Sequence, residues 1–134
     1  MPFRYPHQDL PVFTNTTKYI GKEDDLQKRV AFLLDLTHDC VFFHTPNGGK
    51  RFGKEGKKLQ LMGVKAGVPD ILILNQRKGY AGLAIELKVG RNGLQDSQID
   101  FLEKLHNLNY LTFVSWSLDE IISLIDWYFD KCKK

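Results

Sequence analysis

Two hydrophobic periods alternate along the chain, and together they predict a domain with both helices and strands. Apolar residues that recur three and four positions apart predict helices over residues 22–35, 95–109 and the segment that follows Ser117. Short apolar runs bounded by Gly, Pro or Asn predict strands over residues 41–44, 70–74, 83–89 and 111–116. A further helix is predicted around residues 57–62. The order of helix, three strands, helix, strand and helix indicates an α/β sandwich on a small mixed sheet.

Length and composition fit one compact domain. The 134 residues are 43% hydrophobic and 26% charged, which excludes a largely disordered chain. Residues 1–20, rich in Pro, Thr and aromatic residues, are expected to form an N-terminal arm, and residues 21–134 a single domain. Without a long apolar run or a signal-peptide core, we expect no membrane segment and a cytoplasmic location. Two cysteines are too few for a disulfide scaffold or a zinc site.

Charged residues occupy positions that the pattern assigns to the interior of the sheet. Side chains alternate between the faces of a strand, so Glu86 and Lys88 share one face of the strand over 83–89. Asp70 opens the neighbouring run, whose continuous apolar residues are typical of a strand covered on both faces. A half-exposed strand with a surface ion pair is the simpler explanation. Buried charges, however, require strong compensation, which a functional site provides.

The first predicted helix directs one of three consecutive acidic residues toward the core. At about 100° per residue, Glu23 falls on the stripe of Leu26 and Val30, whereas Asp24 and Asp25 point elsewhere. The alternative is a glutamate in the first turn, favoured there by the helix dipole.

Asp70, Glu86 and Lys88 form a recognisable chemical set. Two carboxylates at the ends of adjacent strands can hold a hard divalent cation through their oxygens. A lysine two residues beyond one of them would lie beside that cation, where it can orient a water or neutralise a phosphate. This arrangement is typical of enzymes that cleave phosphodiesters.

The sequence resembles the VRR-NUC (virus-type replication-repair nuclease) family of the PD-(D/E)XK nuclease superfamily, from about Glu23 to about Val114. The matching residues, in order, are Glu23 and Gln27, His44-Thr45-Pro46-Asn47, Gly63, Gly67-Val68-Pro69-Asp70, Ile85-Glu86-Leu87-Lys88 and Gln98. The resemblance implies a restriction-endonuclease-like α/β fold, with a central mixed sheet flanked by helices and an αβββαβ core. Gln95 departs from the pattern, because a small helix-capping residue is expected there.

The resemblance also implies roles for individual residues. It implies that Asp70 and Glu86 bind the metal and that Glu23 completes the acidic cluster. The main-chain carbonyl of Leu87 is implied as a further ligand. The expected ion is Mg²⁺ or Mn²⁺. Lys88 takes the role of the catalytic lysine. Gln98 matches the polar residue that the following helix supplies to the site.

A basic, glycine-containing stretch is the candidate contact for nucleic acid. Its cations, opposed by Glu55 alone, are Lys50, Arg51, Lys54, Lys57, Lys58 and Lys65. A solvated lysine-rich loop is the alternative. His44 and Asn47 flank Pro46 at the end of the first strand and are further candidates for substrate binding. For His44, an ordinary strand histidine and a phosphate contact remain equally open.

The leading hypothesis is a metal-dependent endodeoxyribonuclease. Small stand-alone members of the family are associated with phage and bacterial genomes and with branched DNA such as four-way (Holliday) junctions, so the resemblance implies a role of that kind in DNA repair. A homodimer would present two sites to such a substrate, and the aromatics Trp116, Trp127 and Phe129 are candidates for its interface. The alternatives are a non-catalytic DNA-binding module of the same fold and an RNA-processing nuclease. The net charge of +3 permits an anionic partner without requiring one.

Overall fold

The computed structural model describes residues 10–11, 13–37, 39–46 and 53–130 of the chain. In chain order its elements are α1 (Glu23–Asp35), β1 (Phe42–His44), α2 (Gly53–Leu61), β2 (Ile71–Ile73), β3 (Gly82–Leu87), α3 (Asp96–Asn107), β4 (Tyr110–Ser115) and α4 (Leu118–Tyr128). This order contains the predicted αβββαβ core, with α2 inserted between the first two strands and α4 added at the end.

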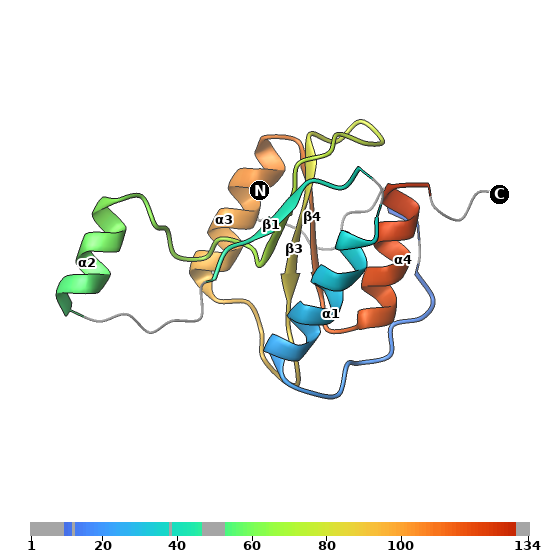
Figure 1. Ribbon diagram of the computed structural model, residues 1–134, viewed down its shortest axis with the longest axis horizontal. Helices are drawn as coiled ribbons and strands as arrows, with labels where there is room; N and C mark the ends of the chain where they lie inside the picture. Colours follow the sequence, from blue (N-terminus) through green and yellow to red (C-terminus); the bar gives the residue numbers. More distant parts are fainter. Residues whose placement is uncertain (1–9, 12, 38, 47–52, 131–134) are drawn as a thin grey trace.

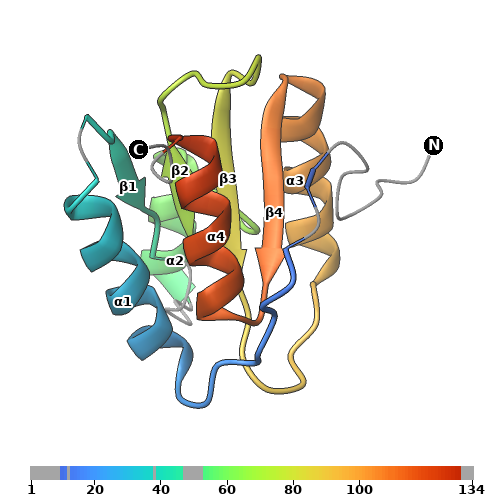
Figure 2. The same ribbon diagram turned by 90° about the vertical axis from the view of Figure 1, so that its right-hand side faces the viewer.

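The four strands form one mixed sheet in the order β1-β2-β3-β4. The pairs β1–β2 and β2–β3 are antiparallel, whereas β3 and β4 are parallel and α3 makes the connection between them. The sheet separates two layers of helices, with α1 and α4 on one face and α3 on the other (Figures 1 and 2). The prediction of a helix-flanked mixed sheet is therefore confirmed.

The main core lies between the sheet and the pair α1 and α4. Leu26, Val30 and Leu34 recur at helical spacing along α1 and are fully buried. Ile121 and Ile125 do the same on α4, whose N-cap Ser117 accepts a hydrogen bond from the main-chain N–H of Glu120. Each helix thus buries one apolar stripe against the strands.

The described part of the N-terminal arm follows the β4 side of the sheet (Figure 2). Leu10, Phe13 and Tyr19 pack against the core. The ring of Phe13 meets that of Phe113 edge to face, with 6.1 Å between the centroids. The main-chain N–H of Tyr19 donates to the carbonyl of Trp116, 2.8 Å away. Packing against β4 thus orders a segment that has no period of its own.

Two expectations from the sequence pattern were wrong in detail. The apolar run at 70–74 is not covered on both faces throughout, because β2 ends at Ile73 and Leu74 is 46% exposed. The helix expected at 57–62 begins earlier, at Gly53. Glycine lowers helix propensity, so Gly53 and Gly56 concealed that start in the sequence.

α2 stands clear of the other elements, on the same side of the sheet as α3 (Figure 1). Its last turn leaves Leu61 and Met62 exposed, at 90% and 71%. Among the described residues, no helix is both long enough and apolar enough to cross a membrane.

Candidate active site

The C-terminal end of β3 and the residue directly after it carry the two central charged side chains of the site. Glu86 and Lys88 are only 3% and 5% exposed, and Lys88 Nζ lies 3.7 Å from Glu86 Oε2. The explanation of a half-exposed strand with a surface ion pair is therefore wrong. β3 is buried along its whole length, because it pairs with a strand on each side and lies between the helix layers.

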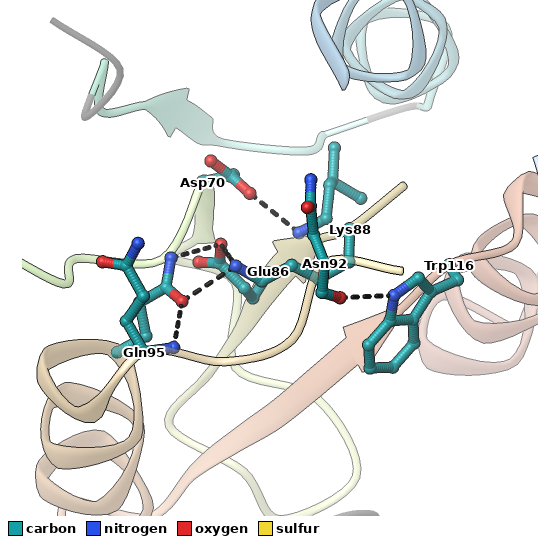
Figure 3. A network of polar contacts seen from close by, with 8 residues as sticks. Asp70, Glu86, Lys88, Asn92, Gln95 and Trp116 are labelled. Carbon is teal, nitrogen blue, oxygen red and sulfur yellow. Dashed lines mark hydrogen bonds and ion pairs between the residues drawn. The ribbon is translucent and has the colours of Figure 1, made fainter. Parts of the chain in front are cut away.

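Strand register brings Asp70 beside Glu86. Ile71 pairs with Ile85 in the antiparallel β2–β3 ladder. Asp70, the residue before Ile71, therefore lies opposite Glu86, the residue after Ile85. The main-chain N–H of Leu87 donates to Asp70 Oδ2 at 2.7 Å and fixes the orientation of that carboxylate (Figure 3). Two carboxylates, 16 positions apart in sequence, thus reach one site.

Electrostatic repulsion and burial act together on this pair. Burial raises the pKa of Glu86 to about 8, and the negative charge of Asp70 contributes to the rise. Burial also raises the pKa of Asp70, although the N–H of Leu87 opposes that effect. Glu86 Oε1 is buried and has no hydrogen-bond partner. Lys88 lowers the pKa of both carboxylates, but burial outweighs it, so their negative charge is only partly compensated.

Gln98, in the first turn of α3, connects the charged residues. Its Oε1 accepts hydrogen bonds from Lys88 Nζ and from the main-chain N–H of Gln95, both at 2.8 Å. Its Nε2 donates to Glu86 Oε2 at 3.1 Å. The helix end is thus capped by Gln98 itself, which explains why Gln95, the N-cap, need not be a small polar residue.

Gly67 allows the segment before Asp70 to approach α3 closely. Its φ of +82° lies in the left-handed region, and a Cβ there would overlap the main-chain carbonyl of Ser97. Only glycine satisfies both conditions. The contact brings the start of β2 against the same helical turn that supplies Gln98.

Glu23 lies exposed in the first turn of α1, close enough to the site for the charges of Asp70 and Lys88 to act on it. Partial burial raises its pKa, the charge of Asp70 raises it further, and Lys88 opposes the rise. Asp25 instead forms a surface cluster with Arg29 and Tyr19. Within the described ranges no group of three or more His, Cys, Asp or Glu side chains is close enough to hold one metal ion. The role of Glu23 as a direct ligand thus remains a prediction, as does that of the Leu87 carbonyl.

His44 belongs to the same end of the sheet. Its Nδ1 lies 2.6 Å from the main-chain carbonyl of Asp70, and the side chain is exposed at the edge of the sheet on β1. Because a carbonyl oxygen only accepts, Nδ1 carries the hydrogen and Nε2 is left for another partner. The sequence did not reveal this contact, because it depends on the pairing of β1 with β2.

Only part of the predicted basic contact falls within the described residues. Asn47, Lys50 and Arg51 lie outside them, as does the side chain of Lys54. Lys57 and Lys58 are exposed on α2. The structure thus separates these two lysines, on a helix that stands clear of the sheet, from the carboxylates.

One residue at the site end of the molecule was not predicted to act there. Trp116 Nε1 donates to the carbonyl of Asn92 at 2.8 Å and holds the loop between β3 and α3 (Figure 3). The sequence pattern assigned Trp116 to the core or to an interface. A tryptophan that ends a strand gives no signal of the loop that it supports.

The chemistry of these groups fits a hard divalent cation. Asp70 and Glu86 supply carboxylate oxygens, one of them buried without a donor, and hard cations prefer such ligands. A cation would also relieve the repulsion from Asp70 that contributes to the raised pKa of Glu86.

An aspartate after a proline, with a glutamate and lysine two residues apart on the adjacent strand, defines a PD-(D/E)XK nuclease on this fold. Comparison with known proteins narrows that class. The family model for the VRR-NUC domain matches residues 22–116. The chain belongs to this family, and its domain is that of a nuclease of the PD-(D/E)XK type, an enzyme class that acts on DNA and generally uses divalent metals.

A solved structure supports the same assignment. That of a "VRR_NUC domain protein" is 30% identical to this chain and superposes with a TM-score of 0.69. The match covers 84% of this chain and 92% of the other. No curated protein matches the chain significantly.

Proposed function

We propose that the protein is a metal-dependent endodeoxyribonuclease that acts on branched DNA. The observation that carries the proposal is the pair Asp70 and Glu86, which lie side by side with an unpartnered oxygen and next to the buried Lys88. A site of this kind favours a divalent cation, and beside it a lysine can act on a phosphate.

Each residue has a distinct part in the proposed reaction. Asp70 and Glu86 would hold Mg²⁺ or Mn²⁺, which supplies a water of lowered pKa and neutralises charge on the scissile phosphate. Lys88 orients the attacking water or stabilises the negative charge that develops on the phosphate oxygens. Gln98 keeps the ammonium group of Lys88 in place through the 2.8 Å hydrogen bond. Glu23 adds negative charge at the outer side of the site.

Contacts outside the reacting centre would hold the DNA. Lys57 and Lys58 on α2 are suited to phosphates of the backbone, which carry most of the affinity of proteins for DNA. His44 Nε2 is suited to a phosphate near the scissile bond, because Nδ1 is already held by the carbonyl of Asp70. For Asn47, Lys50, Arg51 and Lys54 the same role is proposed from the sequence alone.

A homodimer is part of the proposal, and side chains other than the three aromatics are its more exposed candidates for an interface. Trp127 and Phe129 pack against the core, and the indole N–H of Trp116 is bonded to a loop. These aromatics are therefore only partly exposed. Among the described residues, the large hydrophobic side chains with the greatest exposure are Ile20, Phe32, Leu36, Leu61, Met62 and Leu108.

A cleavage assay tests the activity. The protein is incubated with labelled single-stranded, duplex, flap and four-way-junction DNA, and with RNA of the same sequence, in Mg²⁺, Mn²⁺ or EDTA. We expect cleavage with either metal, none in EDTA, and a preference for the junction. Binding without cleavage under every condition would favour the non-catalytic module, and equal cleavage of RNA would favour the RNA-processing alternative.

Light scattering tests the dimer separately. A dimer gives about twice the 15.5 kDa of the chain. A monomer at micromolar concentration that cuts all DNA forms alike would refute both the dimer and the junction preference, while leaving the nuclease activity in place.

A further inference from the structure

Two buried side-chain atoms among the described residues have no hydrogen-bond partner: Glu86 Oε1 and Gln27 Oε1. Glu86 is explained by the proposed cation. None of the hydrogen bonds and ion pairs of the candidate active site involves Gln27. A buried acceptor without a donor costs about 1–3 kcal/mol, so it requires an explanation.

The position of Gln27 on α1 indicates what that explanation is. Gln27 follows Glu23 by four residues, so the two side chains are neighbours on one face of the helix, about 5–6 Å apart at Cβ. The charges of Asp70 and Lys88 act on the Glu23 carboxylate, so this face of α1 is turned toward the site. α1 also packs directly against β3, the strand that carries Glu86.

Both unpartnered atoms are acceptors, and they belong to α1 and β3, which pack against each other. A buried polar oxygen next to the core stripe of α1 would be replaced by an apolar group at no loss if it served the fold alone. A hydrated divalent cation, by contrast, surrounds itself with water molecules whose hydrogens need acceptors, and such outer partners orient the metal site.

We propose that Gln27 is a positioning residue of the nuclease site, whose amide oxygen accepts a hydrogen bond from a water molecule of the cation that Asp70 and Glu86 hold. This inference rests on the proposed metal-dependent function. It assigns to the second turn of α1 a task distinct from that of Glu23: Glu23 contributes charge, whereas Gln27 contributes a neutral acceptor.

Substitution by an apolar residue of the same length tests the proposal. Gln27→Met removes the amide and keeps the volume, so the melting temperature of the metal-free protein is expected to stay the same or to rise. The Mg²⁺ concentration that gives half of the metal-induced increase in melting temperature is expected to rise about 10-fold or more, the scale for losing an outer partner of a metal ligand. Gln27→Glu, which retains an acceptor oxygen, is expected to restore the wild-type Mg²⁺ midpoint or to lower it.

Gln76→Met makes the same chemical change at an exposed position between β2 and β3 and is expected to leave the Mg²⁺ midpoint unchanged. A lower melting temperature for metal-free Gln27→Met, with an unchanged Mg²⁺ midpoint, would overturn the inference and assign Gln27 to the fold. A wild-type protein whose melting temperature does not respond to Mg²⁺ at all would overturn the metal-dependent function itself, and this inference with it.

Discussion

Asp70 and Glu86 approach each other from antiparallel strands, and the negative charge of Asp70 makes the charge of Glu86 less favourable. For both groups burial is the largest cause of the raised pKa. For Glu86 the repulsion from Asp70 is the second largest. Catalytic carboxylates are commonly found in such surroundings, where burial and neighbouring like charges shift pKa values.

The first prediction follows from the pKa of Glu86, which lies at about 8 in the folded protein against 4.5 for the free side chain. Between these values the folded state binds more protons than the unfolded state, so the metal-free protein loses stability as the pH rises from about 4.5 to about 8. Glu86→Gln is expected to flatten this dependence and to melt above wild type at pH 8. Thermal unfolding in EDTA across that range checks it, and parallel curves for the two proteins would contradict it.

The second prediction concerns the amine of Lys88. Lys88→Met retains most of the volume and both metal carboxylates, so Mg²⁺ should still raise the melting temperature, while the cleavage rate at saturating DNA should fall by about 10² or more. Titration with Mg²⁺ and single-turnover kinetics measure the two quantities. Near-native cleavage would mean that Lys88 only balances the charge of Glu86.

The third prediction separates two adjacent acids of α1. Glu23→Gln should reduce cleavage at least about 10-fold, because the Glu23 carboxylate responds to the charges of Asp70 and Lys88. Asp24→Asn, one position along the same first turn, serves as the control and should change little. Equal losses in the two variants would indicate a general effect of negative charge at the helix end.

At the scale of elements, the site depends on how closely the segment before β2 approaches α3. Gly67 provides that approach, and the first turn of α3 then places Gln98 between Lys88 and Glu86. The proposed catalytic groups at the ends of β2 and β3 are thereby held by a helix that follows them in sequence.

The fourth prediction tests this contact with two alanine substitutions. Gly67→Ala places a side chain on a left-handed residue and against the carbonyl of Ser97, which should cost at least about 2 kcal/mol of unfolding free energy. Gly93→Ala, where nothing lies within 4 Å of an added Cβ, should be nearly neutral. Urea unfolding of both variants gives the comparison, and similar midpoints would show that the close approach is not required.

At the scale of the whole molecule, the exposed lysines proposed to bind DNA and the carboxylates proposed to bind the metal lie on different parts of the chain. α2 stands clear of the sheet and exposes Lys57 and Lys58, whereas the carboxylates lie at the end of β3. Affinity for DNA and the rate of cleavage should therefore respond to different substitutions.

The fifth prediction follows from that separation. Neutralising Lys57 and Lys58 with Gln should weaken binding to all DNA sequences and reduce the slope of log affinity against log salt by up to about two phosphate contacts. Cleavage at saturating DNA should fall much less. Lys28 and Lys104, exposed on α1 and α3, supply a control double variant with the same change in net charge. Equal effects in the two double variants would mean that only net charge matters.

Periodicity along the chain was sufficient to predict most of the helices and the side of each strand that faces inward. α1 and α4 bury the stripes that their sequences show, and Glu86 and Lys88 share a face because side chains alternate along a strand. It was insufficient for α2, where glycines mask the start of a helix that packs little on the other elements. Burial along one element is a local property, which neighbouring residues encode.

The sequence by itself determined the chemistry of this protein: a PD…ExK set, an acid at the start of the first helix, and a glutamine on the helix after the lysine. Only the tertiary structure decided that these groups meet. The register of Ile71 with Ile85 sets Asp70 against Glu86, Gln98 reaches both Glu86 and Lys88, and the oxygen of Gln27 is left without a partner. Register and close approach depend on contacts between residues far apart in the chain, and those contacts leave no periodic signal in the sequence.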